Sequence, residues 1–171
     1  MINRKMETLL NEQINLEMYS ANAYWAMCSW LLEKDLDGFA NYFKVQAKEE
    51  LFHAEKQFDY LHDVGGKVTI KAIEQPSSAF GSVLEIFETA LEHEKSVTKS
   101  IGNLIKAAFE ENDFATHTFL QWFVTEQVEE EATVSQIVSK LKMIGDNSSA
   151  LYLLNAELAQ RKFNVATGGA E

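Results

Sequence analysis

Two residues that could bind one metal ion lie in the stretch Glu49-Glu50-Leu51-Phe52-His53. Glu50 and His53 are three positions apart, so on a helix their side chains lie on one face, one turn from each other. A carboxylate and an imidazole at this spacing are a common way for a helix to offer two ligands to one metal ion. The pair alone decides little, because such a pair more often lies on a solvated helix face or contains a capped core histidine.

Further polar residues interrupt apolar seams elsewhere in the chain. Glu17 and Glu94 each break a seam whose apolar residues recur every three or four positions, and Gln127 and Glu130 break another. Glu50 lies 33 positions after Glu17, and Gln127 lies 33 positions after Glu94. Adding 77 to the first pair of numbers gives the second pair. This hidden repeat predicts two pseudo-symmetric metal positions.

The elements that must position these residues follow from helical periodicity and its breaks. We expect four long helices and a shorter fifth one, over residues 3–34, 38–64, 82–112, 113–145 and 148–161. The short link at 35–38 implies that the second helix runs antiparallel beside the first. Residues 67–81 show no helical period and suit a crossover along the bundle, with a short extended piece at 68–70. The tail 164–171 is expected to be disordered.

The sequence therefore predicts an all-α fold, a single domain over residues 1–171. Its architecture is an antiparallel four-helix bundle with a long crossover between helices two and three and a short fifth helix. Ser82 and Asp113 are expected to cap the third and fourth helices. The expected buried stripe of the third helix is Leu84, Phe87, Leu91, Glu94, Thr98, Ile101, Ile105 and Ala108. A second apolar stripe on the second helix, which could face another subunit, is Ala47, Leu51, Ala54, Phe58 and Leu61.

The polar interruptions should meet inside such a bundle. They lie close to the midpoints of helices of about 30 residues, each about 45 Å long, and in an antiparallel bundle the midpoints share one level. We expect one polar cluster in the core, formed by Glu17, Glu50, His53, Glu94, Gln127 and Glu130.

A buried cluster of carboxylates needs counter-charges. An unpaired ionised carboxylate in a core costs several kcal/mol even after relaxation, and four of them also repel one another. Two divalent cations would balance four carboxylates. Oxygen ligands with one imidazole favour iron or manganese, with zinc as a competitor. The alternative is that water fills the centre of the bundle and the carboxylates share protons.

Composition limits the class of function. The chain has 171 residues, of which 46% are hydrophobic, with one Pro and a net charge of −11. The acidic balance argues against binding to nucleic acid or to an anionic membrane surface. The single cysteine, Cys28, excludes an internal disulfide and a Cys-based cluster. Without a long apolar run we expect no signal peptide and no membrane span, so the cytoplasm is the expected compartment.

These residues resemble the ferritin family, and in particular its bacterial non-haem branch, from the first helix to the fifth. The Gln127-x-x-Glu130 pair on the fourth helix departs from the two Glu-x-x-His motifs of the general ferritin-like pattern. That departure is typical of ferritins as opposed to bacterioferritins. Bacterioferritins also have a haem-binding Met immediately before the metal-binding His, where this chain has Phe52. We therefore expect no haem.

The resemblance implies roles for individual residues. Glu17, Glu50 and His53 would form the first iron site, with Glu50 bridging to the second. The second iron site would consist of Glu94, Gln127 and Glu130. A third, adjoining site would consist of Glu49, Glu126 and Glu129, although these could equally be a solvated charge run. Tyr24 would lie beside the diiron centre, and Trp122 could assist electron transfer. Periodicity alone indicates instead that both side chains fill the core. The remaining candidates, expected to be structural or surface residues, are Cys28, His62, His93 and His117.

The resemblance also implies an activity and an assembly. The chain would form a shell of twenty-four copies, bind two Fe(II) per subunit, oxidise them with dioxygen or peroxide and store Fe(III) mineral inside. His117 and Leu120 replace the acidic residues that line the three-fold channel of animal ferritins, so iron could enter by another pore. Two alternatives remain: a diiron enzyme acting on an organic substrate, and a non-enzymatic signalling or adaptor domain that would leave the core carboxylates unexplained.

Overall fold

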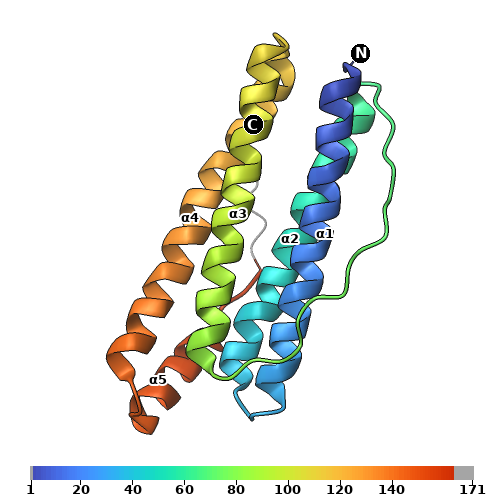
Figure 1. The fold of residues 1–171 in the computed structure, drawn as a ribbon. Helices are drawn as coiled ribbons and strands as arrows, with labels where there is room; N and C mark the ends of the chain where they lie inside the picture. The colour runs from blue at the N-terminus through green and yellow to red at the C-terminus, as the bar shows by residue number, and fades with distance from the viewer. Residues whose placement is uncertain (1, 164–171) are drawn as a thin grey trace.

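The computed structural model describes residues 2–163, and every regular element in that range is a helix. Four long helices form a bundle and a short fifth helix lies at one end of it (Figure 1). The helices are α1 (Arg4–Leu32), α2 (Asp37–Asp63), α3 (Val83–Glu110), α4 (Phe114–Ile144) and α5 (Ser148–Leu158). The predicted all-α bundle is confirmed, and the tail 164–171, expected to be disordered, lies outside the described residues.

The helix starts are set by side-chain caps. The carboxylate of Asp113 accepts a hydrogen bond from the Thr116 backbone N–H at 3.0 Å, and the hydroxyl of Ser82 accepts one from Glu85 at 3.1 Å. The Glu85 carboxylate in turn accepts from the Gly81 N–H at 2.7 Å, one residue before the position that a standard capping box uses. Both predicted caps are therefore present.

The connection over residues 64–82 carries the chain back along the full length of α1 (Figure 1). It contains no regular structure and is fastened by the side chain of Asn11. Asn11 donates to the Lys67 carbonyl at 2.9 Å and accepts from the Thr69 N–H at 2.6 Å. As a consequence of this crossover, α3 starts at the same end of the bundle as α2 and runs parallel to it, so α1 with α2 and α3 with α4 are the antiparallel pairs.

The core consists of two apolar clusters, one toward each end of the bundle. One end contains an aromatic group with T-shaped and tilted ring contacts, formed by Tyr24, Phe39, Tyr42, Phe43 and Phe87. The other end is mainly aliphatic and includes Met6, Leu10, Ile14, Leu61, Ile101, Leu104 and Leu120. Between them lies a layer of buried polar residues that includes Glu17, Glu50, His53, Glu94, Gln127 and Glu130. The predicted meeting of these residues at mid-bundle depth is thus confirmed.

Two sequence expectations need correction. The buried face of α3 passes through Ile86, Ala90, Val97 and Leu104, and Thr98 is exposed, so the predicted stripe is turned partly away from the core. The α5 helix ends at Leu158 rather than near Arg161, because the following carbonyls turn toward a side chain of α2. On the second stripe of α2, Leu51 is 48% exposed and Phe58 36% exposed, and the contact of this stripe with another subunit stays a prediction.

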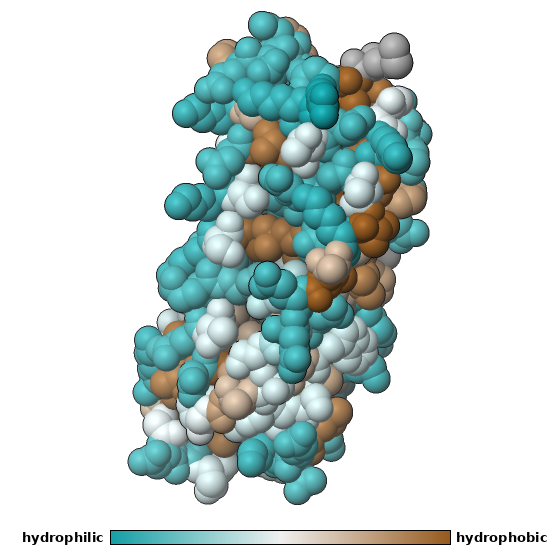
Figure 2. All heavy atoms as spheres, turned by 45° about the vertical axis from the view of Figure 1, so that its right-hand side comes forward, coloured by the Kyte–Doolittle hydropathy of each residue, from teal (hydrophilic) through white to brown (hydrophobic). Residues whose placement is uncertain are grey.

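Exposed apolar side chains are spread over the surface. On the face that carries α1 and the crossover, hydrophobic residues appear in separate patches between hydrophilic ones (Figure 2). None of the described helices has the length and apolar character needed to cross a membrane.

Candidate metal centre

Three predicted ligands lie close together in the middle of α1 and α2. Glu17, Glu50 and His53 each place a ligand atom within 4.8 Å of the others, and their exposed fractions are 0%, 1% and 3%. The Glu50 Oε2 and His53 Nδ1 atoms are 3.8 Å apart. Two carboxylates and an imidazole at such distances, removed from water, form a donor set suited to a divalent transition metal.

Glutamine side chains support one of these carboxylates. Glu17 Oε1 accepts hydrogen bonds from Gln13 Nε2 at 3.0 Å and from Gln57 Nε2 at 2.9 Å. Its second oxygen, Oε2, is buried without a hydrogen-bond partner, and so is Glu50 Oε2. A buried carboxylate oxygen that makes no hydrogen bond is costly unless a cation fills the space beside it. The two orphaned oxygens belong to the same cluster and could bind the same ion.

The second half of the polar layer comes from α3 and α4. Glu94 accepts a hydrogen bond from the Tyr24 hydroxyl on one oxygen and from Gln127 Nε2, at 3.1 Å, on the other. Glu130 Oε2 accepts from Gln46 Nε2 at 2.8 Å. These groups are held by hydrogen bonds to Tyr24, Gln127 and Gln46. The two halves therefore differ in their donor groups, since the first contains an imidazole and the second an amide.

Burial and mutual repulsion hold protons on these carboxylates. Burial raises the pKa of Glu94 to about 8, and the charge of Glu130 adds to the increase. Burial also raises the pKa of Glu50 well above its usual value, with further increases from the charges of Glu94, Glu17 and Glu130. In the opposite sense, burial lowers the pKa of His53 to about 4, with a contribution from the charge of Lys56. The imidazole is therefore neutral at pH 7, as a metal ligand must be.

The residues of the predicted third site lie further out. Glu49 is 17% exposed, and burial raises its pKa to about 7, while the charge of Arg161 lowers it. The guanidinium of Arg161 makes an ion pair with Glu49 Oε2 at 2.7 Å. Glu126 is half-buried and Glu129 is exposed. Their carboxylates do not join Glu49 in a compact ligand cluster, so the third site stays a prediction.

Aromatic rings close one side of the centre. The Trp122 ring lies 5.4 Å from the His53 ring, centroid to centroid. It lies 6.0 Å from the ring of Phe52, the residue whose lack of a ligand atom led to the prediction of no haem. Lys56 Nζ lies 4.7 Å from the centre of the Trp122 ring. His93, expected to be structural, packs edge-on against Tyr24 and shares a hydrogen bond of 2.7 Å with Ser20.

Sequence reasoning missed four residues around the centre. Gln13 was assigned no role, although it lies one turn before Glu17 on the same face. Gln46 and Gln57 lie on the polar seam of α2, and their position between apolar neighbours was the available signal. Arg161 had no signal, since it lies 112 positions from Glu49 in the chain.

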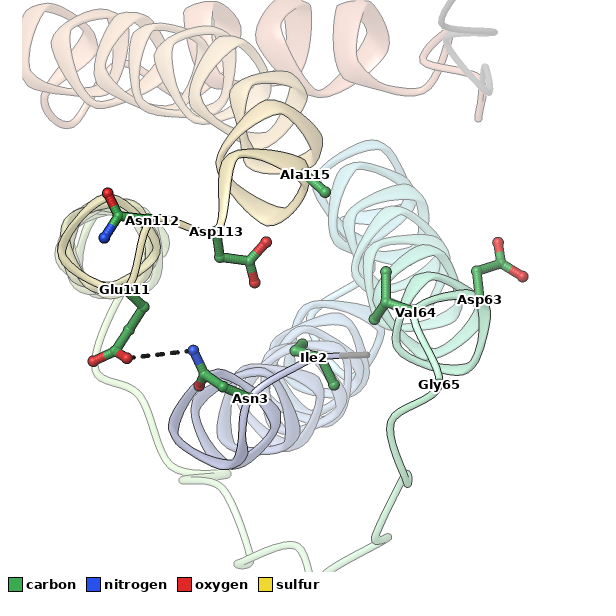
Figure 3. Close-up of a pocket in the computed structure, with 9 residues that line it drawn as sticks. All are labelled: Ile2, Asn3, Asp63, Val64, Gly65, Glu111, Asn112, Asp113 and Ala115. Carbon is green, nitrogen blue, oxygen red and sulfur yellow. Dashed lines mark hydrogen bonds between the residues drawn. The ribbon is translucent and has the colours of Figure 1, made fainter.

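A separate cavity of about 610 Å³ lies at the end of the bundle, where the start of α1, the end of α2 and the turn between α3 and α4 meet (Figure 3). Two of its carboxylates have partners, since Glu111 accepts from Asn3 and Lys5 and Asp113 caps α4, and the third, Asp63, is exposed. The cavity contains no histidine, so its donor set does not compete with the central cluster.

Leu120 is one of the two residues at the predicted channel positions. Its side chain is completely buried and cannot line a pore.

Comparison with known proteins gives the family. A family model described as "Ferritin-like domain" matches residues 7–144. The chain is 44% identical to a bacterial non-heme ferritin from Staphylococcus saprophyticus, over 96% of this chain and 98% of that protein. The chain belongs to the ferritin family. It is also 44% identical to a bacterial non-heme ferritin from Campylobacter jejuni, over 90% of this chain and 92% of that protein.

Solved structures give the same fold. An open-pore ferritin from the hyperthermophilic archaeon Archaeoglobus fulgidus superposes with a TM-score of 0.94 at 48% sequence identity, covering 95% of this chain and 99% of that one. A form of this archaeal ferritin engineered to be closed superposes with a TM-score of 0.95. The identity extends over nearly the whole of both chains, so the likeness concerns the complete bundle with its fifth helix.

Proposed function

We propose that this protein stores iron and is a ferroxidase: it binds two Fe(II) in the bundle core, oxidises them with dioxygen or peroxide and stores Fe(III) as mineral. Iron is here the substrate and the cargo. The observation that carries the proposal is the buried Glu17–Glu50–His53 cluster, with its two orphaned carboxylate oxygens, in a chain of the ferritin family. A purely structural core would have no use for such a costly group of carboxylates.

The residues divide the work between two positions. Glu17 and His53 would hold the first Fe(II), and Glu94, Gln127 and Glu130 the second. Glu50 would bridge them, since the charges of Glu94, Glu17 and Glu130, which come from both halves, all act on its carboxylate. Tyr24, hydrogen-bonded to Glu94, would position that ligand. We assign no haem to the protein, because Phe52 offers no ligand atom at the position next to His53.

The reaction balances without a further reductant. Each of two Fe(II) ions gives one electron, and dioxygen takes both with two protons to form hydrogen peroxide; peroxide as oxidant would take two electrons and two protons to give water. Fe(II) binding releases the protons that burial holds on Glu50 and Glu94, because a carboxylate must be ionised to bind a metal. The protein thus supplies geometry, charge and protons, and the metal supplies the redox chemistry.

The two positions should differ in affinity. The first has Glu17, Glu50 and the imidazole of His53, whereas the second has Glu94 and Glu130, shares Glu50, and has the neutral amide of Gln127 in place of an imidazole. We infer that the first fills earlier and that the second turns over and releases Fe(III). Glu49, Glu126 and Glu129 would bind a third iron on the way to the mineral. The assembly would be a shell of twenty-four subunits in the cytoplasm.

Mineral retention tests the proposal against its main alternative, a diiron oxidase with an organic substrate. Purified protein is given aerobic Fe(II) in increments, and iron that co-sediments with large particles is measured. We expect hundreds of iron atoms retained per particle in the parent and early precipitation with Glu50→Ala. Glu55→Ala, an exposed glutamate on the same helix, is the control. A parent that oxidises Fe(II) but retains only the ions of its binding sites would contradict storage.

A further inference from the structure

Arg161 lies beyond the end of α5 and places its guanidinium on α2. Its NH2 group makes the 2.7 Å ion pair with Glu49 Oε2, and its NH1 group lies 3.5 Å from the Tyr42 carbonyl oxygen. The guanidinium carbon is 4.3 Å from the centre of the Tyr42 ring, which is cation–π distance. The side chain is 22% exposed. Three different contacts therefore fix one orientation of this group.

The backbone that carries Arg161 is also fixed. Asn41 Nδ2 donates to the carbonyls of Leu158 at 3.1 Å and of Arg161 at 3.0 Å. One turn earlier on α5, Asn155 Oδ1 accepts from the backbone N–H groups of Gly38 and Phe39. These contacts end the helix and direct the following residues onto the first turns of α2. The cation is delivered to Glu49 by a docked segment rather than by a free surface side chain.

The position of this cation matters because of what lies beside it. Glu49 immediately precedes the central ligand Glu50 in the chain, and the charge of Arg161 also acts on Glu130. Among residues 2–163, two ion pairs involve a predicted iron ligand. One is the His53–Glu50 contact inside the centre, and the other is the Arg161–Glu49 pair. The other nearby cation, Lys56, is held over Trp122.

We propose that Arg161 is a built-in counter-cation that occupies the Glu49 carboxylate and must be displaced before a divalent cation can bind there. The inference rests on the proposed function, since it assumes that Glu49 belongs to an outer iron site. A guanidinium and a metal ion on one partly buried carboxylate repel each other, because both carry positive charge at contact distance, so Arg161 opposes metal binding at Glu49. The outer position is therefore the last to fill. Its filling displaces the Arg161 guanidinium from Glu49, while Asn41 and Asn155 keep the backbone of α5 and the following residues on α2.

Anaerobic calorimetric titration with Zn(II), which is not oxidised, tests this. Arg161→Gln keeps a polar side chain of similar reach but removes the charge, and we expect the weakest class of sites to tighten about tenfold, the order expected for losing a hydrogen bond to a charged group. Arg161→Lys keeps the charge and should retain weak outer binding. Lys140→Gln is the matched control, because Lys140 ties α5 to the bundle through a 2.7 Å ion pair with Glu157, away from the centre. Equal outer affinity in parent and Arg161→Gln would overturn the proposal.

A double-mutant cycle separates competition from loosening of the fold. In a Glu49→Gln background the outer class should be lost, and adding Arg161→Gln should change nothing further. A change of similar size in that background would show that Arg161 acts through the docking of α5, which contradicts the proposal. Failure of the proposed function looks different: the parent would then lack the tight classes that Glu50→Ala removes. If the tight classes of Zn(II) sites are intact but the affinity of the outer class does not change with Arg161→Gln, only the role of Arg161 is overturned.

Discussion

Replacement of Glu94 by glutamine should make the metal-free protein more stable at alkaline pH. Folded Glu94 keeps its proton up to about pH 8, whereas a glutamate of ordinary pKa, 4.5, has lost it long before. The folded state thus binds more protons between these pH values, so this group's contribution to stability is complete below 4.5 and is lost as pH rises through 8. A tenfold change in a protonation equilibrium is about 1.4 kcal/mol, so the loss is on the order of 5 kcal/mol for this group.

The gain from the substitution is smaller than this loss. The new amide can accept from only one of the two present donors. If its oxygen accepts from Tyr24, its NH2 group faces the NH2 group of Gln127, which now donates to Glu94 at 3.1 Å; if the amide is reversed, the Tyr24 hydroxyl proton loses its acceptor. A mismatched buried polar pair costs about 1–3 kcal/mol. We therefore expect Glu94→Gln to raise the free energy of unfolding at pH 8 by about 2–4 kcal/mol in the absence of metal.

Urea unfolding with chelator present, at one protein concentration and between pH 6.5 and 8, provides the assay. Below pH 6.5 the opposite effect of His53 enters: its pKa of about 4 in the fold means that stability falls as pH drops from 6.5 toward 4. Glu92→Gln is the control, since Glu92 is exposed two residues away. If parent, Glu92→Gln and Glu94→Gln show the same slope with pH, Glu94 is not protonated in the metal-free core. With a cation at a hundred times its dissociation constant the parent should gain about 2.7 kcal/mol, and Glu94→Gln should gain less.

Two further substitutions separate the sites. Glu50→Ala should slow the first rapid Fe(II) oxidation by at least about tenfold in stopped-flow traces, whereas Glu49→Ala, about 100° around the helix, should leave that phase intact; equal losses would refute the bridging role. Gln127→Glu should destabilise the metal-free protein, because it sets a carboxylate against Glu94, and should tighten the second position and slow mineral growth. Equal anomalous occupancy of both positions in the parent at every sub-stoichiometric loading would refute the inequality behind this expectation.

The level of the metal centre could be predicted because the bundle geometry is simple. Helices of similar length that run antiparallel bring their midpoints to one depth, so the polar residues at those midpoints had to meet. The face of α3 could not be fixed in the same way. The predicted stripe and the observed one share Phe87, Glu94, Ile101 and Ala108, and they differ by a small rotation that only packing against α1 and α4 decides. This rotation turns Thr98, a residue of the predicted stripe, toward solvent.

Contacts between side chains that are far apart in the sequence could not be predicted for a different reason. A glutamine on a polar seam looks the same whether it donates to a buried carboxylate or to water, so the roles of Gln46 and Gln57 depend on which helix lies opposite. Arg161 required both the correct end of α5 and the docking of Asn41 on the carbonyls that follow it. Local periodicity carries no information about either.

The glutamines explain how the centre can stay formed when it holds no metal. A storage protein must pass repeatedly through an empty state, in which four buried carboxylates face one another. Gln13 and Gln57 donate to Glu17, Gln46 donates to Glu130 and Gln127 donates to Glu94. An amide satisfies a carboxylate oxygen without neutralising its charge, unlike a lysine or an arginine, which would compete with the cation for the same oxygen. Glu17, Glu94 and Glu130 are thus held by neutral donors, while a cationic side chain pairs with Glu49, which lies outside the central cluster.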